Sequence, residues 1–386
     1  MAFELQKRGH DVSVMTAIPD YPKGRFFDGY GFLKRRKEVV NGVKIHRSLI
    51  FPRGNGNAIR LALNYLSYTI FASVKAIWFG ITRKYDAVIV HETSPVMVGI
   101  PAVIIKKLQR IPLHFWVLDL WPESLSAAGG IHNVRVLSVF EKLTKWIYNN
   151  SKTLLIGSKG YRKYINNQGD YDAKMIYYPN WVDEMEVDSS ISIPQLPNGF
   201  NVIFTGNVGD AQDFPHVIET AKCLKDYKEI NFIIIGDGRK REWVETQAST
   251  HSLDNIKCLG RFPISSMPMF YASASVLFLA LKDREIFALT APAKLQAYMS
   301  SGKPVVGMIN GEGADLIKEA DCGWSVPAED SEALADLLLK LSKEDKEVLE
   351  QKGKNGKLYS QKHFNFKNSI DRLEAILKGS KQSTKS

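Results

Sequence analysis

The feature that most constrains the fold is a repeated alternation of short β-type runs with longer helical stretches. In the second half, five runs are apolar at almost every position, as expected for parallel strands buried on both faces: NVIFTG, NFIIIGDG, NIKCLG, ASVLFLAL and KPVVGM. The first half has similar runs at 12–16, 86–91, 113–119, 153–158 and 174–178. Such alternation is typical of parallel α/β domains, and 386 residues suit two of them.

The stretches between these runs predict helices at 57–82, 95–109, 133–149 and 159–167, and near the end at 331–341, 343–353 and 366–377. Within 38–47, Asn41-Gly42 interrupts an alternating pattern and predicts a β-hairpin. The apolar stretch 61–81 is long enough to cross a bilayer. Asn64, Lys75 and several hydroxyl groups interrupt it, which favours a helix that is buried or docked on a surface.

The segment 181–200 breaks the alternation, and its Asp, Ser and Pro content indicates a linker. We therefore expect an N-terminal Rossmann-like domain at 1–180, a linker at 181–199 and a second Rossmann-like domain at 200–360. A C-terminal helix at 361–378 and a disordered tail at 379–386 should follow. A ligand would bind between the domains, at the carboxyl ends of the strands.

The chain starts partway through this pattern. Residues 2–16 predict the end of a helix, a Gly9 termination signal and a strand. In a Rossmann-like domain a strand and its glycine turn precede that helix, so the sequence predicts that the first, central strand of the N-terminal domain is missing. The alternative is a shifted topology.

The charge and the cysteines limit the possible partners. A net charge of +10 suits a phosphate-bearing ligand, an anionic membrane surface or a nucleic acid, or serves solubility alone. The basic residues do not form one aromatic-interleaved patch, so we expect no nucleic-acid partner. Three scattered cysteines (Cys223, Cys258 and Cys322) fit a reducing, cytoplasmic compartment and predict no metal site.

Three strand ends in the second half carry glycines or cations that suit a phosphate ligand. FTGNVGDAQDF runs from a strand through a glycine loop into a helix, whose free N–H groups would accept a diphosphate. It is not a GxGxxG fingerprint, and such turns also exist for geometry alone. The candidate donor-binding residues are Gly206, Asn207, Gly209 and Asp210 in the first loop, Gly236, Gly238, Arg239 and Lys240 in the second, and Arg261 after the third. The cations could equally be solvated surface residues.

A fourth candidate lies in LTAPAKLQAYMSSGKPVVG, where Pro292 marks a helix start. Lys294 falls in the first turn, where its charge opposes the helix macrodipole. A cation at such a place is easier to understand if an anion binds there, and the alternative is a salt bridge. We therefore add Pro292 and Lys294 to the donor-binding residues.

In the first half, acids emerge at strand ends. Asp119 follows seven largely apolar residues, at an edge suited to acceptor binding or proton transfer, and is our catalytic candidate. Glu123 lies four residues further on, and His91 and Glu92 follow another strand. These three are candidates for the acceptor side, although a histidine at a strand end is more often structural.

Together these strings resemble the group 1 (family 4) glycosyltransferases, particularly the WbuB-type enzymes of bacterial O-antigen and capsule synthesis. The matching segments occur in order along nearly the whole chain: ELQKRGHDVSVMTAIPDYPKG, LDLWPES, FTGNVGDAQDF, IIIGDGRKR, LGRFP, PAKLQAYMSSGKPVV and CGWSVPAEDSEALA. The resemblance implies a GT-B fold, in which two Rossmann-like domains face a central cleft.

The resemblance also implies a retaining transfer of a hexosyl group from a nucleotide sugar, UDP- or GDP-linked, to a polyprenyl-diphosphate-linked saccharide. It implies no cofactor and no metal at the diphosphate. The chain departs from the family pattern at three places. Leu289 and Ala297 stand where two glutamates are common, and Asn207 and Gln212 stand near an absent Arg and Lys. Leu118 replaces a frequent histidine.

These departures keep two alternatives open. The chain could be a non-catalytic or decayed homologue that acts as a partner subunit, or a GT-B nucleotide-sugar epimerase. A lipid-linked acceptor would place the protein on the inner face of the plasma membrane as a peripheral protein. The segment 25–37, which mixes aromatics with five cations, would dock there or serve as a mobile acceptor loop.

Overall fold

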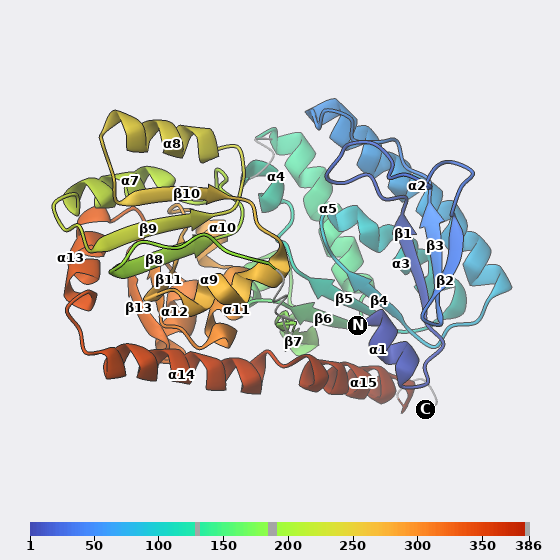
Figure 1. Cartoon of the computed structure of the whole chain (residues 1–386). Coiled ribbons are helices and arrows are strands. Elements are labelled where there is room, and N and C mark those ends of the chain that lie inside the picture. The colour runs from blue at the N-terminus through green and yellow to red at the C-terminus, as the bar shows by residue number, and fades with distance from the viewer. Residues whose placement is uncertain (128–131, 184–190, 383–386) are drawn as a thin grey trace. The chain divides into compact units, whose positions relative to one another are not determined.

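A computed structural model describes residues 1–127, 132–183 and 191–382 of the chain (Figure 1). The chain divides into two compact units, and each is described by itself. The N-terminal unit comprises residues 1–157, 161–178 and the C-terminal segment from Ser369. The C-terminal unit comprises residues 158–160 and 179–368.

The N-terminal unit contains two sheets. One is parallel throughout, with the order β4-β5-β6-β7, and consists of β4 (Val88–His91), β5 (Leu113–Val117), β6 (Thr153–Ile156) and β7 (Met175–Tyr177). Every residue of β5 and β6 is buried, which fits their uninterrupted apolar runs. The other sheet has the order β1-β3-β2 and consists of β1 (Ser13–Ala17), β2 (Lys37–Val40) and β3 (Val43–Ser48).

The predicted hairpin is confirmed. Strands β2 and β3 pair antiparallel, with Val40 opposite Val43. Asn41 and Gly42 form the turn with φ angles of 48° and 81°, the left-handed conformation that a two-residue hairpin turn requires.

Helices cover these sheets. They are α1 (Ala2–Lys7), α2 (Ala58–Thr82), α3 (Gly99–Gln109), α4 (Glu123–Ala127), α5 (Val134–Asn150) and α6 (Tyr161–Gln168), with short 3-10 turns at Val96–Val98 and Asp172–Lys174. The last helix, α15 (Phe366–Gln382), enters this unit at Ser369. Arg8 holds it through Asp371 at 2.5 Å and Glu374 at 3.0 Å.

The C-terminal unit is built on one parallel sheet with the order β10-β9-β8-β11-β12-β13. Its strands are β8 (Phe200–Thr205), β9 (Ile230–Ile235), β10 (Ile256–Gly260), β11 (Val276–Ala280), β12 (Val305–Met308) and β13 (Gly323–Val326). This is the Rossmann order, in which the chain reverses direction across the sheet between the first and fourth strands. The switch point therefore lies between β8 and β11.

Both faces of this sheet are covered by helices (Figure 1). These are α7 (Phe214–Cys223), α8 (Arg241–Thr250), α9 (Met267–Ala272), α10 (Glu285–Ala288), α11 (Ala293–Ser301), α12 (Glu312–Glu319), α13 (Ser331–Leu341) and α14 (Lys346–His363), with a 3-10 turn at Ile264–Ser266. Side chains alternate between two cores: Phe232 and Ile234 of β9 join α7, α8 and α13, whereas Ile233 joins α9, α11 and α12.

Three elements near the C-terminus differ from what the sequence predicted. Strand β13, within CGWSV, was not expected, because its four residues are only partly buried and carry no long apolar run. Helix α14 does not end at Gly353 but continues to His363. Helix α15 continues to Gln382, so the tail expected to be disordered from 379 starts inside a helix, and 383–386 lie outside the described residues.

Gly353 has a packing role rather than a terminating one. A Cβ atom at this position would lie 2.1 Å from the carbonyl oxygen of Gly302, at the end of α11. Helix α14 therefore approaches α11 closely because Gly353 has no side chain.

The helix α2 matches the predicted 57–82 segment within one residue, and its start is capped by the Asn57 side chain, which accepts from Arg60 N. No helix in the described parts of the chain is both long and apolar enough to cross a membrane.

The close contact of Gly353 predicts that Gly353→Ala lowers the free energy of unfolding by about 1–3 kcal/mol, through overpacking against Gly302. Gly379→Ala is the matched control, because Gly379 is also helical but a Cβ there meets nothing within 4 Å. It should be neutral or stabilise by up to about 1 kcal/mol. Urea denaturation checks both variants, and equal effects would contradict this account of α14.

Candidate functional site

The C-terminal unit places its candidate residues at the switch point, beyond the carboxyl ends of β8 and β11. In open α/β sheets, ligands bind at this point because neighbouring loops diverge there. The loop after β8 contains Gly206, Asn207, Gly209 and Asp210, and the loop after β9 contains Gly236, Gly238, Arg239 and Lys240.

These two loops are joined closely by their backbones. Gly206 N donates to Ile235 O at 2.8 Å, and Val208 N donates to Asp237 O at 2.9 Å. A Cβ atom on Gly236 would lie 1.8 Å from Gly206 O, so only glycine permits this approach. The loop after β10 is attached in the same way, through Gly236 N to Gly260 O at 2.8 Å. The glycines thus fix a rigid backbone surface at the strand ends.

Part of this surface presents unused hydrogen-bond donors. The amide N–H groups of Asn207 and Asp210 have no acceptor among the described residues. Those of Ala293 and Lys294, in the first turn of α11, are likewise free within that part of the structure. Pro292 precedes them as the N-cap, with no side-chain cap. Both sets of N–H groups are suited to an anion.

The Lys294 side chain extends from the start of α11 to the loop after β8, where the two sets of free N–H groups lie. Its Nζ lies 3.5 Å from the centroid of the Phe204 ring. It also lies 3.5 Å from where a Cβ of Gly206 would be. No carboxylate pairs with it in residues 1–127, 132–183 and 191–382, so the salt-bridge alternative is wrong for the described residues. Burial lowers the pKa of this ammonium to about 7.

A buried hydroxyl network, which the sequence did not indicate, supports the end of β8. The Tyr298 hydroxyl accepts from Thr205 N at 2.8 Å, and the Tyr271 hydroxyl lies 3.4 Å from Thr205 Oγ1. Tyr298 follows Lys294 by four residues on α11, so both side chains lie on one face of that helix. The four-residue spacing from Lys294 was the one sequence signal for Tyr298. Tyr271 and Tyr298 lie on separate helices, so no sequence motif joins them.

The other predicted cations do not converge on this point. Lys240 Nζ lies 3.6 Å from Asp210 and over the Trp243 ring, which offsets its charge. Arg239 and Arg261 are exposed at their loops. The Asn207 side chain lies against Gly209 and Gly238. It occupies the space that a Cβ atom on either glycine would need.

Residues 158–160, which belong to the same unit, contact the backbone that precedes α11. Ser158 Oγ donates to Leu289 O, and Ala291 N donates to Ser158 Oγ at 3.2 Å. A Cβ on Gly160 would lie 2.6 Å from Leu289 O. Leu289, one of the two positions that lack the glutamate common in similar enzymes, is therefore part of a tightly packed backbone turn.

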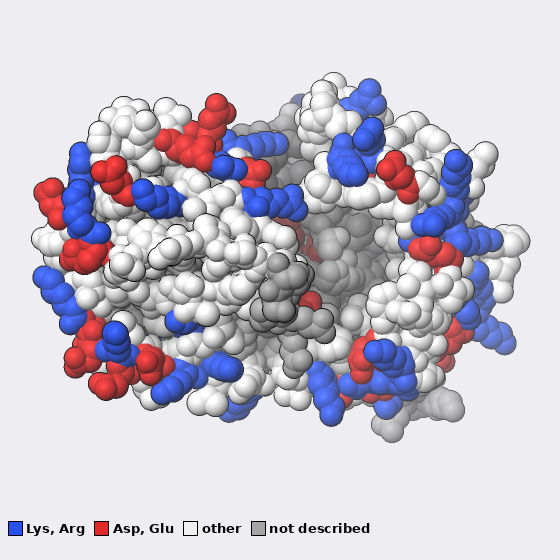
Figure 2. Space-filling view, in the orientation of Figure 1, with Lys and Arg blue, Asp and Glu red and all other residues white. Residues whose placement is uncertain are grey.

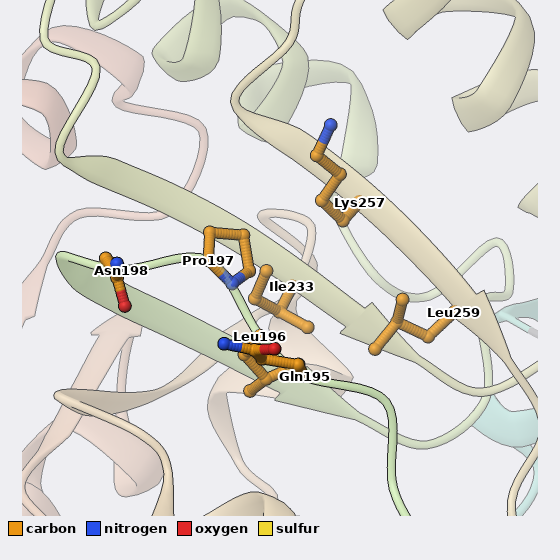
Figure 3. A pocket seen from close by; sticks show the side chains of 7 residues that line it. All are labelled: Gln195, Leu196, Pro197, Asn198, Ile233, Lys257 and Leu259. Carbon is orange, nitrogen blue, oxygen red and sulfur yellow. The ribbon is translucent and has the colours of Figure 1, made fainter.

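Two hollows of the C-terminal unit lie elsewhere. One, of about 420 Å³, lies beside β9 and β10 and is lined by Gln195, Leu196, Pro197, Asn198, Ile233, Lys257 and Leu259 (Figure 3). The other, of about 730 Å³, is at the amino ends of the strands, where Gly199, Ser275 and Pro304 line it. Neither hollow is lined by a predicted site residue.

In the N-terminal unit, two of the predicted acids lie together. Glu92 follows β4 and is completely buried, and Asp119 follows β5. Burial and the Asp119 charge raise the pKa of Glu92 well above its ordinary value, although the amides of Asp119 and Leu118 act in the opposite direction. Burial therefore favours the protonated, neutral form of the Glu92 carboxyl.

Asp119 has local partners. Its Oδ1 accepts from Leu120 N at 3.1 Å and from the Ser124 hydroxyl, which ties it to the start of α4. Glu123 opens α4 one turn later. The His91 ring packs edge-on against Trp116, with centroids 4.8 Å apart, and burial lowers its pKa. Glu92 and Asp119 thus form the polar centre of this part of the unit. His91 directly precedes Glu92 in the sequence, and Glu123 follows Asp119 by four residues.

No cluster of three His, Cys, Asp or Glu side chains with metal-binding geometry occurs in the described portions of the chain.

Known proteins resemble this chain over most of its length. Residues 1–181 match the glycosyl transferase 4-like domain, and residues 199–344 match glycosyl transferases group 1. The probable glycosyltransferase WbjE of Pseudomonas aeruginosa is 26% identical over 303 residues, covering 75% of this chain and 74% of WbjE. The putative colanic acid biosynthesis glycosyl transferase WcaI of Escherichia coli K12 is 22% identical over 317 residues, covering 77% and 75%.

Solved structures show the same fold. Sucrose-phosphate synthase from Thermosynechococcus elongatus has a TM-score of 0.73 at 15% identity, covering 98% of this chain and 91% of that one. HepE of Anabaena, in complex with UDP and glucose, has a TM-score of 0.65 at 13% identity, covering 88% and 87%. The predicted GT-B fold is confirmed.

The burial of Lys294 predicts a pH-dependent effect on stability. Between about pH 7 and 10.5 the unfolded chain binds more protons at this site than the folded chain, so stability rises with pH through that window. Lys294→Met should therefore raise Tm, and by more at pH 6 than at pH 9. Lys343→Met, at an exposed lysine, is the control and should leave Tm unchanged at both values. A Lys294→Met gain that does not depend on pH would contradict the burial argument.

The raised pKa of Glu92 predicts the opposite dependence of stability on pH. Its raised pKa means that the folded chain holds the proton longer, so stability falls as pH rises above about 4.5. Glu92→Gln keeps the neutral shape and should raise Tm by an amount that grows as pH rises above about 4.5, measured by differential scanning fluorimetry. Asp119→Asn, which removes a carboxylate that accepts two hydrogen bonds, should lower Tm. Destabilisation by Glu92→Gln at pH 8 would show that Glu92 is ionised.

Proposed function

This chain belongs to the group 1 glycosyl transferases, and we propose that it moves a sugar from a nucleotide-sugar donor, UDP- or GDP-linked, to a lipid-linked saccharide acceptor. The observation that carries the donor part is Lys294. It is a partly buried ammonium without an acidic partner among the described residues, beside free N–H groups at two loop ends. A diphosphate supplies the negative charge that this arrangement lacks.

The chemistry follows from charge. When the glycosidic bond of the donor breaks, negative charge develops on the leaving diphosphate. Fixed N–H groups and one ammonium stabilise that charge without reorganisation, and they do so in place of a metal ion. We propose that no cofactor takes part, and that the leaving phosphate oxygen accepts the proton of the acceptor hydroxyl. The sugar would then keep its anomeric configuration.

The acceptor part rests on the N-terminal unit. Asp119 is our candidate to orient the acceptor hydroxyl, and Glu92, whose protonated form is favoured by burial, would donate a hydrogen bond nearby. Since WcaI is named for colanic acid biosynthesis, we propose a role in bacterial surface polysaccharide synthesis, in O-antigen or capsule assembly. A polyprenyl-diphosphate-linked acceptor would hold the protein in the cytoplasm, against the inner face of the plasma membrane.

A second candidate function has a specific observation in its favour. Leu289 and Ala297 lack the carboxylates that in similar enzymes contact the donor, and Leu289 is fixed in a packed turn. A homologue that binds the nucleotide but supports another subunit would fit this loss. Binding of donor without turnover, with activity only when a partner protein is added, would support this candidate.

Donor binding is tested by calorimetric titration with UDP and with GDP. Lys294→Met should weaken binding of the preferred nucleotide by about 10- to 100-fold, because it removes a charged hydrogen-bond donor. Lys343→Met should bind as the parent protein does. Affinity should also fall about tenfold between pH 7 and 8.5, because free Lys294 loses its proton over this range and must regain it to bind.

Two outcomes would count against the proposal. If neither UDP nor GDP binds, the donor assignment fails altogether. If UDP or GDP binds with an affinity that changes neither with pH nor with Lys294→Met, then the diphosphate binds elsewhere.

A further inference from the structure

Helix α2 exposes a long apolar stripe. Seven branched aliphatic side chains follow one another at intervals of three or four residues and are 45–73% exposed: Ile59, Leu63, Leu66, Ile70, Val74, Ile77 and Ile81. Phe71 and Trp78, 39% and 63% exposed, extend the stripe on one side. We call these nine residues the outer face of α2. At 1.5 Å per residue the face is about 33 Å long.

The amphipathic pattern of this helix is inverted. The side that packs on the protein is mostly small or polar, with buried Asn64, Ser67, Ala72 and Ala76, and Phe79 is the one large apolar side chain among the buried residues of α2. Asn64 donates to Phe51 O at 2.7 Å and to Asp20 at 3.1 Å, and the Ser67 hydroxyl accepts from Phe51 N. A surface helix of a soluble protein normally buries its large apolar residues and exposes its polar ones. An apolar patch of this length marks an interaction surface.

Two neighbours continue the apolar surface. Phe51, 53% exposed, is held against α2 by the Asn64 and Ser67 bonds. Leu108 of α3, 48% exposed, lies where a Cβ of Gly80 would touch it, at 2.5 Å. The exposed apolar surface thus extends beyond the outer face of α2 onto Phe51 and Leu108.

The segment that contains this face is strongly basic. Residues 25–85 contain twelve Lys or Arg and two Asp or Glu, so this segment alone carries a net +10, equal to that of the whole chain. No acid occurs between 39 and 85. Exposed cations stand at both ends of α2, at Arg60 and Lys84, and beside it on α3 at Lys107. Figure 2 shows Lys and Arg gathered along the edge of the N-terminal unit that β2, β3 and α2 form.

Lys75 illustrates how the helix keeps charge off the outer face. Its ammonium turns inward and donates to the carbonyl oxygen of Arg47. Burial and the charges of Arg36 and Lys37 lower its pKa to about 8. From Leu61 to Thr82 the outer face therefore has no exposed charge.

We propose that the outer face of α2 docks the protein on an anionic lipid bilayer, with the helix lying in the membrane plane. Apolar side chains enter the acyl boundary, and the surrounding cations contact anionic headgroups. A second copy of the chain is the less suitable occupant, because it would bring two segments of net +10 together. This inference extends the lipid-linked acceptor of the proposed function, and it places docking on α2 rather than on the segment 25–37 alone.

The test is vesicle flotation of the full chain without nucleotide or acceptor, with phosphatidylcholine vesicles containing or lacking about 30% phosphatidylglycerol. The parent protein should float with the anionic vesicles and much less with the neutral ones. The triple variant Ile70→Ser, Val74→Ser, Ile77→Ser should lower the partition coefficient by about tenfold or more. The control variant Ile264→Ser, Val348→Ser, Leu358→Ser changes three exposed apolar residues of the C-terminal unit and should float as the parent does.

A second readout needs no destabilising change. Trp78 emission should shift to shorter wavelength when anionic vesicles are added, and Trp78→Phe should abolish most of that shift. A parent protein that stays soluble with anionic vesicles, or a triple variant that floats equally well, overturns the proposal. So does a dimer that forms without lipid and is lost in the triple variant, since a second copy would then cover the face. Because no donor is present, failure here is separate from failure to bind UDP or GDP.

Discussion

The candidate site of the C-terminal unit is arranged around the buried amine of Lys294, at the end of the central strand β8. Lys294 lies over Phe204 and against Gly206, with no acid nearby among the described residues. Burial disfavours the charged form of an unpaired amine, and this lysine lies at the Rossmann switch point, where neighbouring loops also leave N–H groups free among the described residues. The glycines that join the loops after β8, β9 and β10 make this surface rigid. In our proposal, a diphosphate bound there would favour the charged form of Lys294.

The family relation makes this site more informative. Similar enzymes commonly have an Arg and a Lys after the first glycine loop, where this chain has Asn207 and Gln212, and two glutamates where it has Leu289 and Ala297. A site with fewer charged side chains must depend more on backbone donors and on Lys294. The tight packing of Leu289 against Ser158 and Gly160 positions that backbone.

Much of this could be predicted from the sequence. Continuous apolar runs gave five strands of the C-terminal sheet, and Asn41-Gly42 gave the hairpin, because both signals are local. Strand β13 was missed because it is short and partly exposed. The helix predicted at 343–353 ended too early, since α14 continues past Gly353, which serves packing against Gly302. Lys294 was found by its unfavourable position on α11. Its contacts with Phe204, and the Tyr298 and Tyr271 network, could not be found, because they join elements far apart in sequence.

The central claim is that Lys294 is largely neutral in the free protein near pH 8 and becomes charged against a diphosphate. Proton uptake measures this directly, by titrating UDP or GDP at pH 8 in buffers of different ionisation enthalpy. The account predicts uptake of close to one proton per nucleotide bound, and almost none in Lys294→Met. Tight binding by the parent protein with no proton uptake would contradict it.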